Sequence, residues 1–174
     1  MYIIGINFGY HETTASYIDT NYTCLRIKRL HILDGNSDES NKVESAVCRD
    51  QITGEWRFPK DYSDYSSPTF YQYFKAPMNT ITLKDKEAFT AFVKLVYEHI
   101  LLNNEFLTKD SFCIYAAYPS AWDKGTGNQI KEYKDFLSKI IPIDSIIKET
   151  DAAYYKFKHE KAVPNATYLI YRYE

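Results

Sequence analysis

A short polar turn near the start of the chain contains residues suited to binding phosphate. Gly9-Tyr10-His11-Glu12 lies between an apolar run, Tyr2 to Phe8, and a second run rich in Thr, Ala and Tyr, Thr13 to Ile18. Glycine in a hairpin turn permits a backbone angle or a close approach that side chains forbid. A hairpin between central strands can present its backbone N–H groups to a phosphate. On these residues alone, an ordinary hairpin that opens a sheet is the simpler interpretation.

The sequence offers little else that could do chemistry by itself. The three cysteines, Cys24, Cys48 and Cys113, are far apart in the sequence, and no histidine lies at ligand spacing from them. This argues against structural zinc or a disulfide framework and favours a reducing compartment. Residues 123–128, Asp-Lys-Gly-Thr-Gly-Asn, superficially resemble a phosphate loop but lack the Gly-x₄-Gly-Lys-Ser/Thr order, so we expect an exposed loop. No Ser–His–Asp or Cys–His arrangement can be argued.

Composition and length indicate one ordinary globular domain. The chain has 174 residues, of which 25% are charged and 45% hydrophobic, and its formal net charge is -2. This charge gives no broad attraction to nucleic acid or to anionic lipid. No apolar run approaches the ~20 residues of a membrane helix, and the start of the chain lacks the basic region and cleavage site of a signal peptide. We therefore expect a cytoplasmic protein without a nucleic-acid or membrane partner.

The elements that must position the turn follow a definite order. Apolar alternation and turn signals predict strands in the first third of the chain, and apolar residues at helical spacing predict helices after it. A continuous apolar run at 111–118 predicts a buried parallel strand. The expected strands are 2–8, 13–18, 24–33, 43–48, 54–58, 111–118, 143–148 and 167–173, and the expected helices are 82–104, 129–141 and about 150–161. A strand meander followed by βα crossovers predicts an α/β fold, a mixed sheet with helices on its faces.

Residues 59–79 carry many of the aromatic side chains, set among Asp, Ser and Pro. We interpret this segment as a loop or short insertion whose aromatic residues pack onto the sheet edge or onto a partner, with packing favoured. Stacking on bases lacks support, because basic residues are not interleaved with the rings. The aromatic residues are Tyr62, Tyr65, Phe70, Tyr71, Tyr73 and Phe74.

This element order, with three motifs in matching places, resembles the first lobe of the actin-like ATPase superfamily, most of all the seventy-kilodalton heat-shock chaperones. Residues 4–9, Ile-Gly-Ile-Asn-Phe-Gly, look like the first phosphate motif of the family. Residues 114–122, Ile-Tyr-Ala-Ala-Tyr-Pro-Ser-Ala-Trp, look like the Val-Pro-Ala strand end of the chaperones, and residues 146–153, Ile-Ile-Lys-Glu-Thr-Asp-Ala-Ala, look like their strand into Glu-Pro-Thr-Ala-Ala. The resemblance implies a ribonuclease-H-like lobe at 1–163 and, at 164–174, an orphan strand that begins a missing second lobe.

The resemblance also implies an ATP site at the opening hairpin. Gly5 and Gly9 would allow close strand packing and the phosphate hairpin. Tyr10 and His11 stand where the family has small residues that donate to the β- and γ-phosphates. Asn7 stands where a carboxylate normally holds hydrated magnesium, so it would hold Mg²⁺ weakly and through water.

Two further residues would act near the γ-phosphate, according to the same resemblance. Lys75, before the long helix, is placed about where the chaperones carry a catalytic lysine, and Glu149 would help hold magnesium or the attacking water. The simpler alternatives are a surface lysine at Lys75 and a carboxylate that caps the third helix at Glu149.

The chain departs from the family pattern at several of these places. Asn7 keeps an oxygen ligand but lacks the charge that Mg²⁺ favours. Tyr10 and His11 are bulkier than threonine and would crowd a phosphate, and a solvent-facing turn residue is the simpler interpretation of His11. Arg172 and Glu174 stand where the second phosphate strand of the family has Asp-x-Gly.

We therefore expect an incomplete ATP-binding lobe that is weakly active or inactive alone, because half of a two-lobed cleft cannot exclude water or orient the γ-phosphate. Its partner would be a second lobe or another protein, and a homodimer through the C-terminal strand is a further expectation. The alternative is a degenerate, non-catalytic interaction module of the same fold. Such a module would bind another chain through its exposed aromatic residues and its orphan strand.

Overall fold

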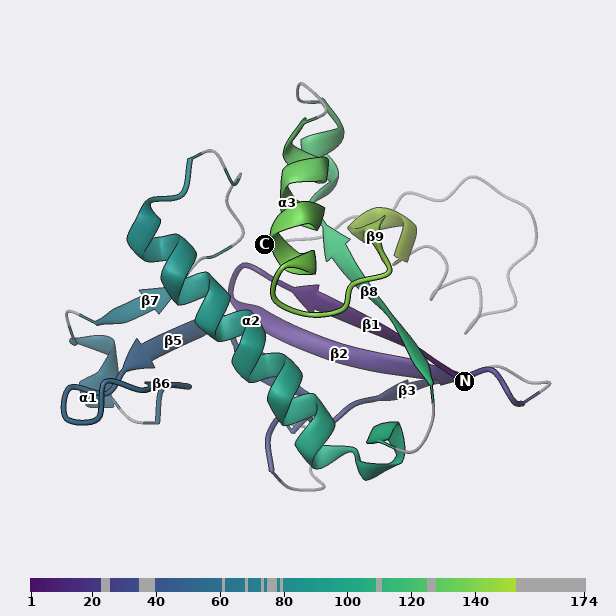
Figure 1. The fold of residues 1–174 in the computed structure, drawn as a ribbon, viewed down its shortest axis with the longest axis horizontal. Helices are drawn as coiled ribbons and strands as arrows, with labels where there is room; N and C mark the ends of the chain where they lie inside the picture. The colour runs from purple at the N-terminus through teal and green to yellow at the C-terminus, as the bar shows by residue number, and fades with distance from the viewer. Residues whose placement is uncertain are drawn as a thin grey trace.

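A mixed sheet of six strands forms the base of the fold in the computed structural model (Figure 1). The structure describes residues 1–22, 26–34, 40–60, 62–67, 69–72, 74, 78, 80–108, 111–124 and 128–152. The strand order is β3-β2-β1-β8-β9, and β4 also pairs with β2. The strands are β1 (Tyr2–Phe8), β2 (Glu12–Asp19), β3 (Ile27–Arg29), β4 (Lys42–Glu44), β8 (Phe112–Tyr118) and β9 (Ser145–Lys148).

The pairing gives this sheet a ribonuclease-H-like arrangement. β2 runs antiparallel to β1, β3 and β4, whereas β1, β8 and β9 are parallel to one another. The antiparallel strands come first in the chain, and the helical crossovers then add the parallel strands on the other side of β1. The predicted α/β class, a strand meander followed by βα crossovers, is therefore confirmed.

Two helices cover one face of the sheet, and α2 crosses it diagonally in Figure 1. Phe8 at the end of β1 meets Phe89 and Phe92 of α2 edge to face, with ring centroids 6.2 and 6.4 Å apart. Phe136 of α3 stacks on Phe89 at 5.3 Å, which places α3 on the same face as α2. The shared apolar layer between sheet and helices is the core. These helices are α2 (Leu83–Asn103) and α3 (Asn128–Ser138).

The helix predicted at 82–104 is confirmed as α2. Thr82 caps its start, since the backbone N–H of Asp85 donates to Thr82 Oγ1 at 3.2 Å. At its end the side-chain amide of Asn104 donates to the carbonyl oxygens of Ile100 and His31 at 2.7 and 2.8 Å. Although α2 is long, no helix in the described ranges is both long and apolar enough to cross a membrane.

A second sheet of three strands, in the order β6-β5-β7, packs against α2. The single strand predicted at 43–48 is wrong, because the chain divides at Ser45 into β4 and β5, which belong to different sheets. The N–H of Ser45 donates to the carbonyl oxygen of His11 at 2.8 Å, and its hydroxyl hydrogen-bonds with that of Thr13 at 2.9 Å. The predicted hairpin around Gly54 is confirmed by the pairing of β5 with β6. The strands are β5 (Ala46–Arg49), β6 (Trp56–Arg57) and β7 (Phe70–Gln72).

The segment predicted as a loop at 59–79 contains two elements, α1 (Tyr62–Tyr65) and β7. β7 forms because its backbone pairs with β5, a partner that lies far away in sequence. Tyr71 packs on Trp56 at 5.6 Å, and Phe74 is buried and stacks on Phe89 at 5.2 Å. The side chains of Tyr62 and Tyr73 lie outside the described residues. Packing within the chain is therefore the right interpretation for Tyr71 and Phe74.

Other boundaries differ from the expectation. The strand expected at 24–33 is described only as β3, and beyond it Ile32 donates its N–H to the carbonyl oxygen of Ser40 at 2.7 Å. α3 ends at Ser138, before the predicted end at 141, and Ile141 closes the last turn on Leu137 at 3.0 Å. Two short 3₁₀ helices were not predicted, η1 (Glu105–Thr108) and η2 (Ser120–Lys124).

Several expectations fall outside the described residues. The helix expected at 150–161 is described only at 149–152. The strand expected at 167–173, the domain boundary at 164 and the positions of Lys75, Arg172 and Glu174 lie outside the described ranges. The homodimer through the C-terminal strand therefore stays a prediction.

The hydroxyl of Tyr133 on α3 is buried and has no hydrogen-bond partner among the described residues. Burial raises the pKa of this hydroxyl well above its ordinary value. Because a buried polar group without a partner is destabilising, we expect Tyr133→Phe to raise the free energy of unfolding by about 1 kcal/mol. Thermal denaturation measures this gain. Tyr118→Phe is the matched control, since the Tyr118 hydroxyl donates to Asp123 and its removal gives no gain. A loss of stability in Tyr133→Phe would contradict the prediction.

Candidate functional site

The carboxyl ends of β1, β8 and β9 lie at one edge of the sheet, because these strands are parallel. From β1 the chain continues to β2 and β3 on one side and later returns to β8 on the other side. Open α/β sheets bind ligands outside the carboxyl ends of their strands, at the point where the strand order reverses. That point lies here between β1 and β8. We call residues 7–12, 118–123 and 148–150 the ligand edge.

Gly9 at the ligand edge has no room for a side chain. A Cβ atom there would lie 2.2 Å from the carbonyl oxygen of Glu12, a backbone atom that cannot move without changing the turn. The N–H of Gly9 donates to the carbonyl oxygen of Asn7 at 3.0 Å, so it is engaged within the turn. Gly5 differs, because a Cβ atom there would meet Ser16 Oγ at an ordinary 3.7 Å. The close packing that the resemblance implies is thus needed at Gly9 and not at Gly5.

Tyr10 and His11 form the tip of the turn and are exposed. Their rings meet edge to face, with centroids 4.8 Å apart and an angle of 90° between the planes. The carbonyl oxygen of His11 accepts the N–H of Ser45, which anchors the tip to the junction between β4 and β5. The two rings are therefore a surface part of the ligand edge, and the solvent-facing interpretation of His11 agrees with its exposure.

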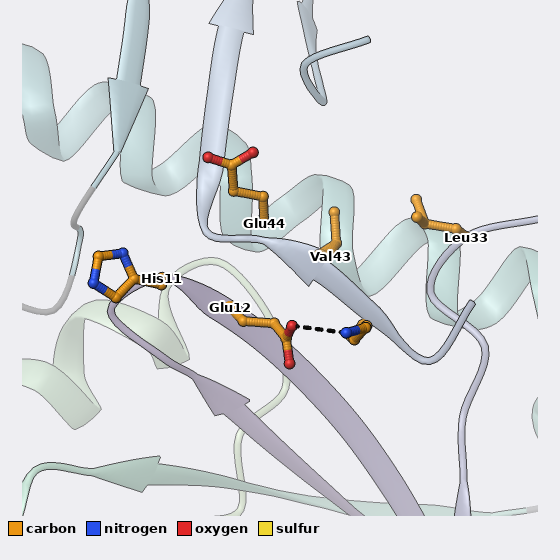
Figure 2. A pocket seen from close by; sticks show the side chains of 6 residues that line it. His11, Glu12, Leu33, Val43 and Glu44 are labelled. Carbon is orange, nitrogen blue, oxygen red and sulfur yellow. Dashed lines mark ion pairs between the residues drawn. The ribbon is translucent and has the colours of Figure 1, made fainter. Parts of the chain in front are cut away.

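A shallow hollow of about 370 Å³ lies on the β4 side of the turn (Figure 2). Glu12 forms an ion pair with Lys42 at 3.2 Å, and the Tyr65 hydroxyl donates to Glu44 at 2.5 Å. Its acidic groups are thus engaged with neighbours, and the hollow lies away from the reversal point between β1 and β8. We do not place the phosphate site there. The lining residues are His11, Glu12, Leu33, Lys42, Val43 and Glu44.

Asn7 is half-buried on the face of the sheet opposite α2. It pairs with Thr14 of β2 and follows Ile6, the last residue of β1 that pairs with β8, where the partner is Ala116. The next residue of β8, Ala117, pairs with Ile147 of β9, so Asn7 lies about level with Ile147. Glu149 follows two residues later, so Asn7 and Glu149 reach the same edge about 10 Å apart across the sheet and about 7 Å apart along the strands. Among the described residues no three His, Cys, Asp or Glu side chains are grouped closely enough to hold a metal ion.

Three polar side chains that the sequence did not connect meet at the ends of β8 and β9. Tyr118 and Lys148 are paired in the parallel register, and Asp123 lies on η2 directly after β8. The Asp123 carboxylate forms an ion pair with Lys148 Nζ and accepts a hydrogen bond from the Tyr118 hydroxyl at 3.2 Å. Beside them the Ser120 hydroxyl donates to the Thr150 hydroxyl at 3.0 Å. We call Tyr118, Asp123 and Lys148 the anion cluster.

The ion pair of the anion cluster shifts the pKa of both its members. The hydrogen bond with Lys148 lowers the pKa of Asp123, and the same bond raises the pKa of Lys148. The contribution of the pair to stability is present above the ordinary aspartate pKa and is lost as pH falls through the lowered pKa of Asp123. At alkaline pH that contribution is lost as pH rises through the raised pKa of Lys148. The pair is therefore fully charged throughout the neutral range.

The structure brings together only part of the expected site. Asn7, Gly9 and Glu149 reach one edge of the sheet, whereas Lys75 lies outside the described residues. The sequence indicates Lys148 only as a strand residue of the motif at 146–153, and Asp123 only as part of an exposed loop. Their meeting depends on the register of β8 with β9, which no local pattern in the sequence encodes.

Comparison with known proteins adds little to this geometry. No family model matches the chain, and no curated protein matches it. Among solved structures, the chain is similar to the crystal structure of the Ppx/GppA phosphatase of Aquifex aeolicus in its type II variant, at 11% sequence identity and a TM-score of 0.38. The match covers 86% of this chain and 36% of that chain, so this chain spans little more than a third of the length of that structure.

Proposed function

We propose that this chain is a nucleotide-binding lobe of the actin-like ATPase type, which binds the phosphates of ATP at the ligand edge. The observation that carries the proposal is the tight β1–β2 turn at Gly9, placed where the strand order reverses. The ribonuclease-H-like strand order supports it, as do the three sequence motifs whose order matches that superfamily. A chaperone-like role and a cytoplasmic location are part of the same proposal.

The residues present suit a metal ion that arrives with the nucleotide. Mg²⁺ usually keeps several water ligands and is bound through one or two carboxylates plus the substrate phosphates. Asn7 offers an uncharged oxygen, and Glu149 offers a carboxylate at the same edge. One carboxylate oxygen of Glu149 is buried, so this side chain has a restricted position. In this arrangement Mg²⁺ would neutralise phosphate charge, while Asn7 and Glu149 would orient its water ligands.

Hydrolysis would need more than these residues. Water has to be excluded from a γ-phosphate by enclosure, and a single lobe supplies only one side of a two-lobed cleft. We therefore propose that a second lobe or a partner protein completes the site, and that this chain alone binds ATP weakly without useful turnover. The alternative function is a non-catalytic interaction module. The aromatic residues at 62–74 and the C-terminal strand suggested it. Of these aromatic residues, Tyr71 and Phe74 pack within the chain, whereas Tyr65 is exposed. The strand lies outside the described residues, so the interaction module remains the outcome of a negative binding test.

A single substitution tests the proposed function. Asn7→Asp restores the carboxylate, so we expect it to tighten Mg·ATP binding about tenfold and to leave binding of metal-free ATP unchanged or weaker. Titration calorimetry with and without Mg²⁺ measures both. Ser111→Asp is the control, because it adds the same charge at an exposed position at the amino ends of the parallel strands. Absence of ATP binding in both the unaltered chain and Asn7→Asp would favour the interaction module.

A further inference from the structure

The anion cluster has the chemistry of an occupied anion site. The Asp123 carboxylate receives two donors, the ammonium group of Lys148 and the hydroxyl group of Tyr118. A phosphate oxygen accepts hydrogen bonds from the same two kinds of donor. A phosphate oxygen could therefore take the position of the Asp123 carboxylate and accept the same two hydrogen bonds.

The cluster lies where an incoming phosphate would need a cation. Among the described side chains of the ligand edge, Lys148 is the only lysine or arginine, whereas Glu12, Asp123 and Glu149 are acidic. An approaching phosphate therefore meets mainly negative charge as long as Asp123 neutralises Lys148. If the phosphate replaces the Asp123 carboxylate, this repulsion falls. The carboxylate then turns to water, and the Lys148 ammonium group faces the phosphate.

We propose that Lys148 and Tyr118 form a phosphate subsite of the ligand edge, and that Asp123 occupies this subsite as an internal competitor when no ligand is bound. The inference rests on the proposed function and adds a form of regulation to it. An ion pair that keeps about a third of each side chain in contact with water contributes little to stability, so a multiply charged phosphate can displace the carboxylate. Asp123 thus lowers the affinity of the site and confines binding to strongly charged ligands.

A purely structural ion pair gives the opposite expectation. In that case the pair only fastens η2 to the end of β9, and removing the Asp123 charge weakens the fold without improving phosphate binding. Asp151 provides the matched control for charge alone. Among the described residues it acts on Lys148 only through its charge, whereas Asp123 also forms the hydrogen bond.

The test uses the full chain and inorganic triphosphate without metal, measured by titration calorimetry at low salt. We expect Asp123→Asn to bind triphosphate about two- to fivefold more tightly than the unaltered chain, the factor that corresponds to the loss of an exposed ion pair. Asp151→Asn should show a smaller gain. Lys148→Gln should weaken binding, and adding Asp123→Asn to it should bring no further gain, because the two substitutions act on one interaction.

Three results would overturn the inference. Equal gains for Asp123→Asn and Asp151→Asn would show a general effect of charge, and so would a gain that persists with Lys148→Gln. The third is the absence of triphosphate binding in every variant, which would remove the subsite. Thermal denaturation verifies that each variant is folded. Lys148→Arg, which keeps the charge, should retain triphosphate binding if Lys148→Gln fails to fold.

The effect of Asn7→Asp on Mg·ATP affinity is measured separately and tests the nucleotide proposal. If that response is absent while Asp123→Asn still tightens triphosphate binding, the nucleotide proposal fails and the subsite stands.

Discussion

Gly9→Ala is expected to lower the free energy of unfolding by about 2 kcal/mol, because forcing a methyl group into a packed position costs roughly 1–3 kcal/mol. The new Cβ atom would lie 2.2 Å from the carbonyl oxygen of Glu12, so the backbone of the turn has to shift. That shift also disturbs the hydrogen bond from Gly9 N–H to the Asn7 carbonyl oxygen. Urea denaturation followed by circular dichroism measures the loss as a lower midpoint at an unchanged slope.

Gly5→Ala is the control for this prediction, because it adds the same methyl group four residues earlier in the chain. Its Cβ atom would meet Ser16 Oγ at 3.7 Å, an ordinary contact. Alanine also loses less conformational entropy on folding than glycine, so stability should stay unchanged or rise by up to about 1 kcal/mol. Equal losses in the two alanine variants would mean that the close approach at Gly9 is not what requires glycine there.

The second large effect is expected at Asp64, where we predict that Asp64→Ala lowers the free energy of unfolding by about 2–3 kcal/mol. The buried Asp64 carboxylate accepts two hydrogen bonds from the guanidinium of Arg57, at 2.7 and 2.6 Å, and one from the N–H of Lys60 at 2.7 Å. Breaking a fully buried pair costs roughly 3–5 kcal/mol. The loss here is smaller, since Arg57 keeps part of its surface in water and still has Asp50 at 3.9 Å.

Hydrogen exchange should locate this loss in the second sheet, at the amides of β5 and β6. The control is Glu87→Ala, which removes an exposed ion pair between α2 and the same sheet, Arg49 to Glu87 at 3.8 Å. An exposed pair of this kind changes stability by no more than about 0.5 kcal/mol. If Asp64→Ala cost no more than Glu87→Ala, the paired hydrogen bonds of Arg57 would not stabilise the sheet.

The central elements of the fold were predictable because their periodicity is local. The apolar residues of α2 recur at helical spacing, and the continuous apolar run of β8 is typical of a strand paired on both sides. The division of one predicted strand at Ser45 was not predictable. It depends on hydrogen bonds from Ser45 to His11 and Thr13, and the hydroxyl bond joins residues 32 positions apart. Contacts at that separation leave no periodic signal around Ser45.

The sequence likewise predicts one part of the candidate site and misses another. Gly9 could be named from the sequence, because a turn of glycine and polar residues between two apolar runs is a local pattern. The anion cluster could not, because Tyr118, Asp123 and Lys148 meet only through the pairing of two strands and the path of η2. Asp123 in particular had the surroundings of an exposed loop residue, and its ion pair with Lys148 is a tertiary contact.

The ring of Phe92 on α2 contacts both sheets. On one side it meets Phe8 at the end of β1, and on the other it meets Phe58, directly after β6. If the small sheet separated from α2, part of this ring would be exposed to water, and the packing of Phe8 would weaken with it. The two sheets therefore form one cooperative folding unit rather than a core with a detachable appendage. A displacement of the small sheet would accordingly reach the end of β1, the residue before Gly9.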